Sequence, residues 1–166
     1  MSKNLSGINS VAGDYKLITV VPTLSTDQYA AGDVLAATAE LADVCLKGGT
    51  CTLESVKIID NDDKKSDFDI LILNANTAVG TINNAYNGAD TVTDDIMTIV
   101  PVVEADYVDM INAQAAFLSA STGDYGCGVV LAPASEGSSL WYALISRDTD
   151  TFSAAGLEIT LAFRRH

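Results

Sequence analysis

The chain has 166 residues, 48% hydrophobic and 19% charged, with a formal net charge of −13 at pH 7. This composition excludes an intrinsically disordered chain, and the length suits one domain with its own core. Between Lys65 and Arg147 the sequence holds ten acidic residues and no lysine or arginine. Phosphate backbones and anionic membranes are bound by clustered cations, so we expect neither nucleic acid nor membrane as a partner.

The N-terminal third is predicted to hold a flexible arm and two strands. Residues 1–13 are rich in Ser, Asn and Gly and indicate an arm, so a single β-domain is expected over 14–166. Residues 15–21 are β-branched and precede Pro22, which is typical of a strand end. In residues 34–46 alanines favour a helix while the flanking glycines favour a strand. We expect a strand.

The middle of the chain predicts a hairpin, a surface excursion and a helix. Apolar runs at 51–60 and 67–73 flank a polar string and predict a β-hairpin. Residues 74–90 are too polar for a core element and predict a surface excursion. The acidic first turn at 93–95 and Pro101 predict one short helix near residues 93–100.

The remaining segments predict further strands, within 102–118 and at 128–132, 139–147 and 156–164. About eight short strands with one helix indicate a mainly all-β fold. We therefore expect an antiparallel β-sandwich or a jelly-roll-like barrel.

The residues that commonly carry catalysis are scarce. His166 is the only histidine, so no internal imidazole is present to act as a general base. Nucleophile-elbow, phosphate-loop and dinucleotide motifs do not occur. We expect a protein that is not an enzyme and that uses no cofactor.

Three cysteines, Cys45, Cys51 and Cys127, make an odd set, for which reduced thiols are the expected state. The alternative is a disulfide between Cys45 and Cys51 across the turn that separates them.

With no leader pattern and no apolar run of about 18 residues, the sequence predicts synthesis in the cytoplasm.

Two further patterns bear on ligands. An acidic cluster suits Ca²⁺ by residue type, but Lys64 replaces a ligand and Leu71 stands where the loop motif needs Glu. The cluster is Asp60, Asp62, Asp63, Asp67 and Asp69, and both interpretations of it stay open: a non-helical calcium site and a solvated turn.

Sugar binding needs aromatic platforms, for which the candidates are Trp141, Tyr142, Tyr125 and Tyr86. Of the neighbours Trp141 and Tyr142, we expect one inside the core and one outside.

Three stretches resemble small virion proteins of tailed bacteriophages, of the capsid decoration, cement or head-associated type. They read STDQYAAGDVLAATAELADV, GGTCTLESVKIIDNDDKKSDFDILIL and LWYALISRDTDTFSAAGLEITLAFRR. The resemblance implies a compact β-domain, often a homotrimer, that binds the outside of a capsid and bridges major capsid protein subunits. It also implies synthesis in the host cytoplasm and a location on the capsid surface.

On this reading the acidic half faces outward, and the arm and the basic strand ends approach the shell. The expected contacts to capsid or neighbouring subunits are Lys3, Leu5, Ile8, Val11, Lys16, Arg147, Arg164 and Arg165. The alternative function is a tail or adhesin β-sandwich, displayed on the virion, that binds host-surface carbohydrate.

Overall fold

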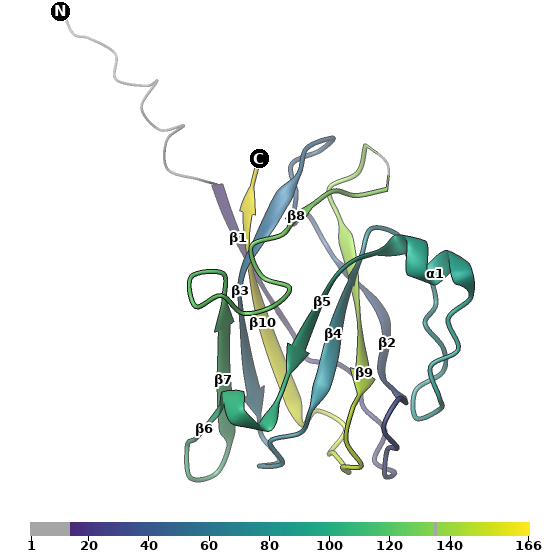
Figure 1. Cartoon of the computed structure of the whole chain (residues 1–166), viewed down its shortest axis with the longest axis vertical. Helices are drawn as coiled ribbons and strands as arrows, with labels where there is room; N and C mark the ends of the chain where they lie inside the picture. Colours follow the sequence, from purple (N-terminus) through teal and green to yellow (C-terminus); the bar gives the residue numbers. More distant parts are fainter. Residues whose placement is uncertain (1–13, 135) are drawn as a thin grey trace, which may run out of the picture.

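The computed structural model describes residues 14–134 and 136–166 and shows two antiparallel sheets packed face to face (Figure 1). The six-stranded sheet has the order β1-β10-β3-β7-β6, with β8 paired to β3, and the four-stranded sheet has the order β2-β9-β4-β5. The predicted β-sandwich is confirmed. Its strands are β1 (Asp14–Val20), β2 (Val34–Leu41), β3 (Cys51–Asp60), β4 (Phe68–Leu73), β5 (Ile96–Val102), β6 (Tyr107–Asp109), β7 (Gln114–Ser119), β8 (Val130–Leu131), β9 (Leu140–Ser146) and β10 (Leu157–Arg165).

The core lies between the sheets and is built from alternate residues of each strand. In β4, Phe68, Ile70 and Ile72 point inward and are fully buried, and in β10 Leu161 and Phe163 do the same from the opposite sheet. Side chains in strands alternate between the two faces, so this alternation places one apolar row of each strand in the core.

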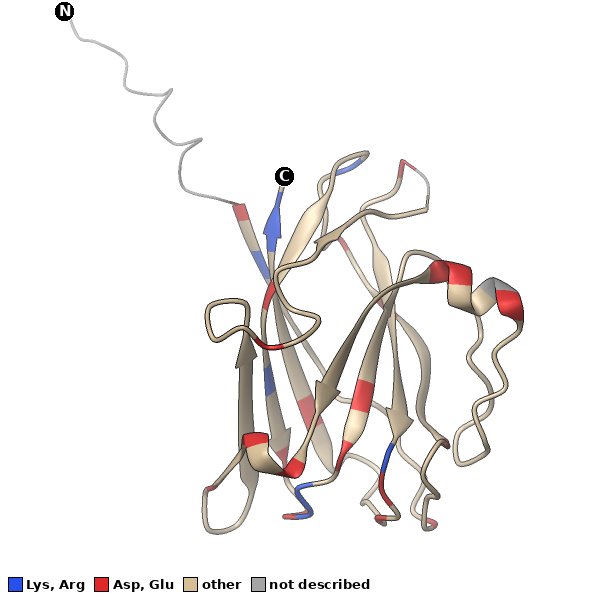
Figure 2. Cartoon of the chain, in the orientation of Figure 1, with Lys and Arg blue, Asp and Glu red and all other residues tan. Residues whose placement is uncertain are grey.

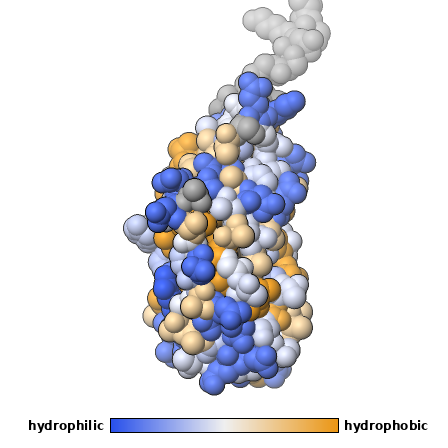
Figure 3. All heavy atoms as spheres, turned by 90° about the vertical axis from the view of Figure 1, so that its right-hand side faces the viewer, coloured by the Kyte–Doolittle hydropathy of each residue, from blue (hydrophilic) through white to orange (hydrophobic). Residues whose placement is uncertain are grey.

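The outer face of the four-stranded sheet is also covered. Every residue of β4 is buried, because Leu71 and Leu73 pack outward against Val79 and Val92. Val92 lies in the short helix α1 (Asp90–Asp95), and Val79 in the excursion predicted at 74–90. The expectation that this excursion adds nothing to a core is wrong at Val79. Figure 3 looks onto this side, where hydrophilic side chains are mixed with smaller hydrophobic areas.

The helix predicted near residues 93–100 is wrong in its extent. Helix α1 ends at Asp95, and Ile96–Val102 forms strand β5 instead. Thr98, Val100 and Val102 are buried in alternation, which is the period of a strand. Pro101 does not stop a helix; it lies in an edge strand, where the missing N–H is tolerated.

The predicted hairpin between 51–60 and 67–73 is also wrong, because its two strands belong to different sheets. Strand β3 pairs with β10 and β7, whereas β4 pairs with β5 and β9. Residues 61–67 therefore form a corner that carries the chain from one sheet to the other. Apolar alternation identified both strands, but it does not specify their partners.

The expected thiol state of Cys45 and Cys51 is wrong as well. The two residues are joined in a disulfide, with their Cα atoms 5.0 Å apart, and both are buried. The bond closes the connection from β2 to β3, which is a second crossing between the sheets. It also removes the thiol-based support for synthesis in a reducing compartment.

Candidate interaction surface

The two sheets differ in what covers their outer faces. The six-stranded sheet presents outward side chains that solvent reaches, whereas the other sheet lies under α1 and the excursion. We call this accessible surface the open face. It consists of Tyr15, Leu17, Thr19, Ser55, Lys57, Val108, Phe117, Glu158, Thr160 and Ala162.

The open face is apolar at both margins, and the surface between the margins is hollowed. Leu17 on β1 is 67% exposed and Phe117 on β7 is 66% exposed, although both are large hydrophobic residues. Between them, small side chains on β3 and β10 line a shallow hollow of about 470 Å³. The open face therefore carries two exposed apolar margins separated by a strip that includes Lys57, Glu158 and Thr160, and exposed apolar patches are candidate interaction sites in soluble proteins.

A second apolar feature extends the β7 margin. The turn between β6 and β7 exposes Met110 by 60% and Ile111 by 86%, beside Val108 on β6. Ile111 has φ of 78°, a left-handed conformation that is unfavourable for a β-branched residue. Its backbone N–H donates to Asp109 Oδ1 at 2.7 Å, which holds the turn. Strained backbone conformations cluster at functional sites, so this turn is a candidate extension of the surface.

Charges on the three strands β1, β10 and β3 neutralise one another. Lys57 Nζ lies 3.8 Å from Glu158, Arg164 Nε lies 2.8 Å from Glu54, and an Arg165 nitrogen lies 2.6 Å from Asp14. Such exposed pairs contribute little to stability. They do leave this part of the surface without the negative charge that dominates the rest of the chain (Figure 2).

The structure brings together only some of the predicted contact residues. Lys16, Arg164 and Arg165 lie at the same end of β1 and β10, where Tyr15 pairs with Arg164 and Asp14 with Arg165. Arg147 directly follows β9, which ends at the opposite end of the sandwich (Figure 1), and the Arg147 Nε donates to Asp69 at 2.7 Å. Arg147 therefore does not join the other three as one contact surface.

Four of the predicted contacts, Lys3, Leu5, Ile8 and Val11, lie outside the described residues. The exposed Leu17 and Phe117 were missed in the sequence. The sequence does contain a pattern that indicates Leu17. Apolar residues occur at both odd and even positions of residues 15–21, so both faces of a strand there carry apolar side chains. A strand with one face in the core and apolar residues on the other has a second face that can take part in an interaction.

The acidic cluster at 60–69 is used for structure. Asp60 is fully buried and accepts backbone hydrogen bonds from Asp62 at 3.0 Å, Lys64 at 2.7 Å and Lys65 at 2.8 Å. Asp69 is paired with Arg147, and Asp63 accepts from Gln114. Within residues 14–134 and 136–166, no group of three or more His, Cys, Asp or Glu is arranged to hold a metal ion.

The same end of the molecule concentrates negative charge, and this charge helps to raise the pKa values of Tyr107 and Asp150. Burial raises the pKa of Tyr107, and the nearby charges of Asp60 and Asp67 raise it further. Burial also raises the pKa of Asp150, with a contribution from the charge of Asp148. Figure 2 shows several acidic residues in the loops at the lower end of the sandwich.

The aromatic residues predicted for sugar stacking do not form one platform. Tyr142 is in the core and Trp141 is half-buried on the outer side, as expected for neighbours in a strand. Trp141 lines an open hollow of about 450 Å³ with Glu40, Asn74 and Asn76.

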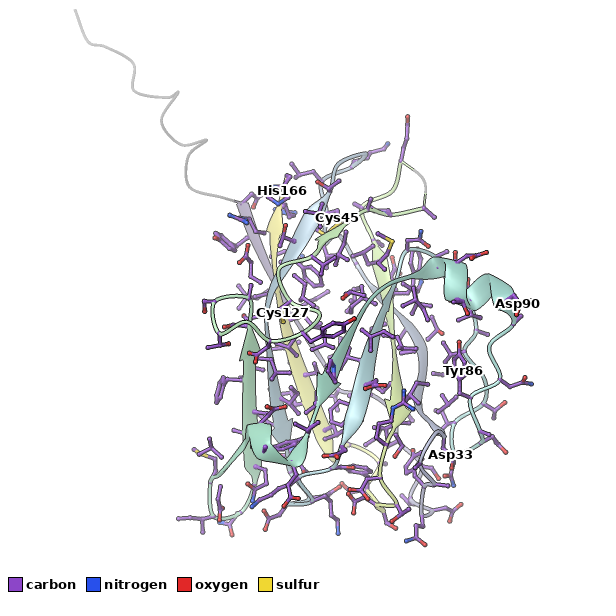
Figure 4. All side chains as sticks on the ribbon, viewed as in Figure 1. Asp33, Cys45, Tyr86, Asp90, Cys127 and His166 are labelled. Carbon is purple, nitrogen blue, oxygen red and sulfur yellow. A yellow bond between two sulfur atoms is a disulfide. The ribbon has the colours of Figure 1, made fainter. Side chains whose placement is uncertain are left out.

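The other two aromatic candidates lie elsewhere. Tyr86 lies on the excursion (Figure 4), where it borders a separate hollow with Leu71 and Ile99. Tyr125 is 75% exposed in the loop after β7.

Cys127, the free thiol, and His166, the one imidazole, lie in different parts of the molecule. Cys127 is a half-buried free thiol, and burial together with the charges of Asp124 and Glu54 raises its pKa to about 11. His166 Nε2 lies 2.9 Å from the Thr52 hydroxyl, at the end of the sandwich that also holds Cys45 (Figure 4). Among the described helices, none has the length and apolar character needed to cross a membrane.

Comparison with known proteins gives little beyond this geometry. No protein-family model matches the chain, and no curated protein matches it. A chain in the structure of deformed wing virus carrying the GFP gene is similar over 98% of this chain and 79% of that one, with 9% identity and a TM-score of 0.39. A chain in the structure of infectious bursal disease virus Gx strain is similar over 92% and 37%, with 13% identity and a TM-score of 0.21. Both TM-scores are too low to carry an argument about function.

Proposed function

We propose that this chain is a structural virion protein that binds the outside of a tailed-bacteriophage capsid and stabilises it by bridging major capsid protein subunits. The observation that carries the proposal is the open face, with Leu17 and Phe117 exposed at its margins. The resemblance to decoration and cement proteins supplies the kind of partner. The proposal includes a non-enzymatic role, location on the capsid surface, synthesis in the host cytoplasm and assembly as a homotrimer.

The physical basis of such a role is avidity. An oligomer that contacts several capsid subunits links modest interfaces at high effective concentration, so each interface needs little affinity of its own. A broad face with apolar margins suits this role better than a deep pocket, because capsid subunits offer extended surfaces. The acidic remainder keeps the free protein soluble and disfavours binding to packaged nucleic acid.

Co-sedimentation with expanded heads that lack this protein tests the proposal. We expect the wild-type chain to pellet with the heads and Phe117→Lys to lose most of that binding. Val103→Lys is the matched control, since Val103 is a 43% exposed apolar residue outside the open face. Absence of wild-type binding at micromolar protein, or equal loss in both variants, would contradict the proposal.

The Trp141 hollow favours a second candidate, an adhesin that binds neutral carbohydrate. An indole beside the amides of Asn74 and Asn76 and the carboxylate of Glu40 offers a stacking surface and hydrogen-bonding groups. A glycan array compares the wild type with Trp141→Ala and with Tyr86→Ala as control. Binding that only Trp141→Ala removes would favour the adhesin, and a flat wild-type array would reject it.

A further inference from the structure

Both edges of the four-stranded sheet are interrupted. Along β2, the Val34 N–H donates to the Asn84 carbonyl and the Tyr86 N–H donates to the Gly32 carbonyl, both at 2.9 Å. The excursion therefore takes up the backbone groups at the start of this edge, and β2 is irregular beyond it, with register shifts between Val34 and Ala36 and between Ala36 and Ala39. Open strand edges invite pairing with other chains, and natural proteins usually cover them.

Two features prevent another strand from pairing along the β5 edge. Pro101 lacks an N–H, and the loop after β7 lies against the strand. Thr98 Oγ1 donates to the Gly126 carbonyl at 3.2 Å, and a Cβ on Gly126 would lie 2.2 Å from the Ile99 carbonyl oxygen. In the six-stranded sheet, the β6 edge has only three residues and ends in the Ile111 turn.

Strand β1 is different. All seven of its residues pair with β10 in one continuous register, without a bulge. Within residues 14–134 and 136–166, no backbone hydrogen bond reaches its other edge. The strand contains no proline, and Tyr15 and Leu17 are 55% and 67% exposed beside this edge. Among the described residues, β1 is therefore an open edge along its full length, flanked by apolar side chains.

The charge distribution indicates what fits this edge. Strands β1, β10 and β3 together carry four cations and four anions, so the entire net charge of −13 lies on the rest of the chain. These residues are Lys16, Lys57, Arg164 and Arg165 against Asp14, Glu54, Asp60 and Glu158. Two copies of an acidic protein repel, and this neutral margin is where they approach at the least electrostatic cost.

We propose that β1 pairs antiparallel with β1 of a second copy about a two-fold axis at Leu17, which joins two six-stranded sheets into one. This register pairs all seven residues and opposes each Leu17 to its counterpart. Asp14 then faces Val20 and Lys16 faces Ile18, so no like charges stand directly opposite. The contact is isologous and closes on itself, as in most homodimers.

This inference concerns self-association and does not depend on the proposed capsid role. A two-fold contact gives dimers, or hexamers where it links two of the homotrimers proposed above. Capsid binding can fail while the pairing holds, and the reverse also applies. Head co-sedimentation and native mass therefore report on the two proposals separately.

Native mass spectrometry and sedimentation of the full chain test the pairing. We expect dimers or hexamers of the wild type at protein concentrations up to about 100 µM, and loss of the two-fold association in Leu17→Lys. Phe117→Lys is the matched control, with the same exposure on the same face but on β7, and we expect it to associate as the wild type does. Circular dichroism confirms that both variants fold.

A rescue experiment tests the axis itself. Leu17→Lys and Leu17→Glu chains should each fail to pair alone, whereas an equimolar mixture should form heterodimers because opposite charges then face each other. A wild type that is a monomer or a trimer at these concentrations would overturn the proposal. A mixture that does not associate, or a Phe117→Lys chain that dissociates equally, would also overturn it.

Discussion

A single buried carboxylate, that of Asp60, stabilises residues 61–67, which connect the two sheets. Asp60 accepts three backbone hydrogen bonds without exposure to solvent. Hydrogen bonds to a charged group contribute about 1.5–3 kcal/mol each, and unpaired buried donors are costly. We expect Asp60→Asn to lower the free energy of unfolding by about 3 kcal/mol or more, measured by urea denaturation.

The control for Asp60 is Asp27→Asn, which alters an exposed side chain and should change stability by no more than about 0.5 kcal/mol. The same measurement examines the calcium alternative. Because the carboxylates of the cluster are engaged by backbone, Arg147 and Gln114, added Ca²⁺ should leave the unfolding midpoint of the wild type unchanged. A calcium-dependent rise would contradict a purely structural role for these residues.

Ile111 is a residue at which stability and binding should change in opposite directions. Asn tolerates the left-handed backbone far better than Ile, and Ile111 is 86% exposed, so little burial is lost. We expect Ile111→Asn to raise the free energy of unfolding by about 1 kcal/mol and to weaken co-sedimentation with heads. Met110→Asn should weaken binding without the gain in stability. A destabilised Ile111→Asn chain would show that the turn is not strained.

At the scale of elements, the loop after β7 protects the edge of β5 through one glycine. Gly126 has φ of 85°, and a Cβ there would meet the Ile99 backbone. Gly123, in the same loop, has φ of 80° but open space around it. We expect Gly123→Ala to cost about 1 kcal/mol through its backbone conformation alone and Gly126→Ala to cost clearly more. Equal losses in thermal denaturation would show that the loop does not pack on β5.

The disulfide makes the crossing between β2 and β3 covalent. In denaturant without reductant, we expect one reactive thiol per chain, from Cys127, and three after reduction. Closing a short loop should stabilise the chain by roughly 2 kcal/mol, which a reductant would remove. In the native protein Cys127 should resist alkylation at about pH 8.5, the ordinary pKa of a thiol, because its own pKa is about 11. Three reactive thiols before reduction would contradict the bond.

At the scale of the whole molecule, the sequence predicted which segments are strands better than which strands are neighbours. Residues 15–21, 139–147 and 156–164 were identified because β-branched and alternating patterns are local. The pairing of β3 with β10, over about a hundred residues of separation, is set by tertiary packing that no local pattern records.

The errors have the same physical origin. Residues 96–100 were assigned to a helix because acidic residues precede them, yet their place at a sheet edge decided their conformation. The contact residues were predicted from charge, which grouped Arg147 with Lys16, Arg164 and Arg165 although Arg147 lies at the opposite end of the sandwich. Exposed apolar residues such as Phe117 cannot be distinguished from core residues until the sheet they belong to is known.

Net charge sets the response of the whole molecule to salt. The described residues hold four ion pairs, each contributing at most about 1 kcal/mol, while the chain carries a charge of −13 that opposes compaction. Repulsion should dominate, so we expect the unfolding midpoint to rise as NaCl increases from about 0.01 to about 0.2 M, where the screening length falls below about 10 Å.

A less acidic variant provides the control for this salt effect. Asp90, Asp94 and Glu136 are exposed and take part in none of the four ion pairs, so Asp90→Asn, Asp94→Asn and Glu136→Gln together reduce repulsion without breaking a pair. The combined variant should be more stable than the wild type at low salt and should respond less to added NaCl. A midpoint that falls with salt would instead mean that the ion pairs along β1, β3 and β10 outweigh the repulsion of the acidic remainder.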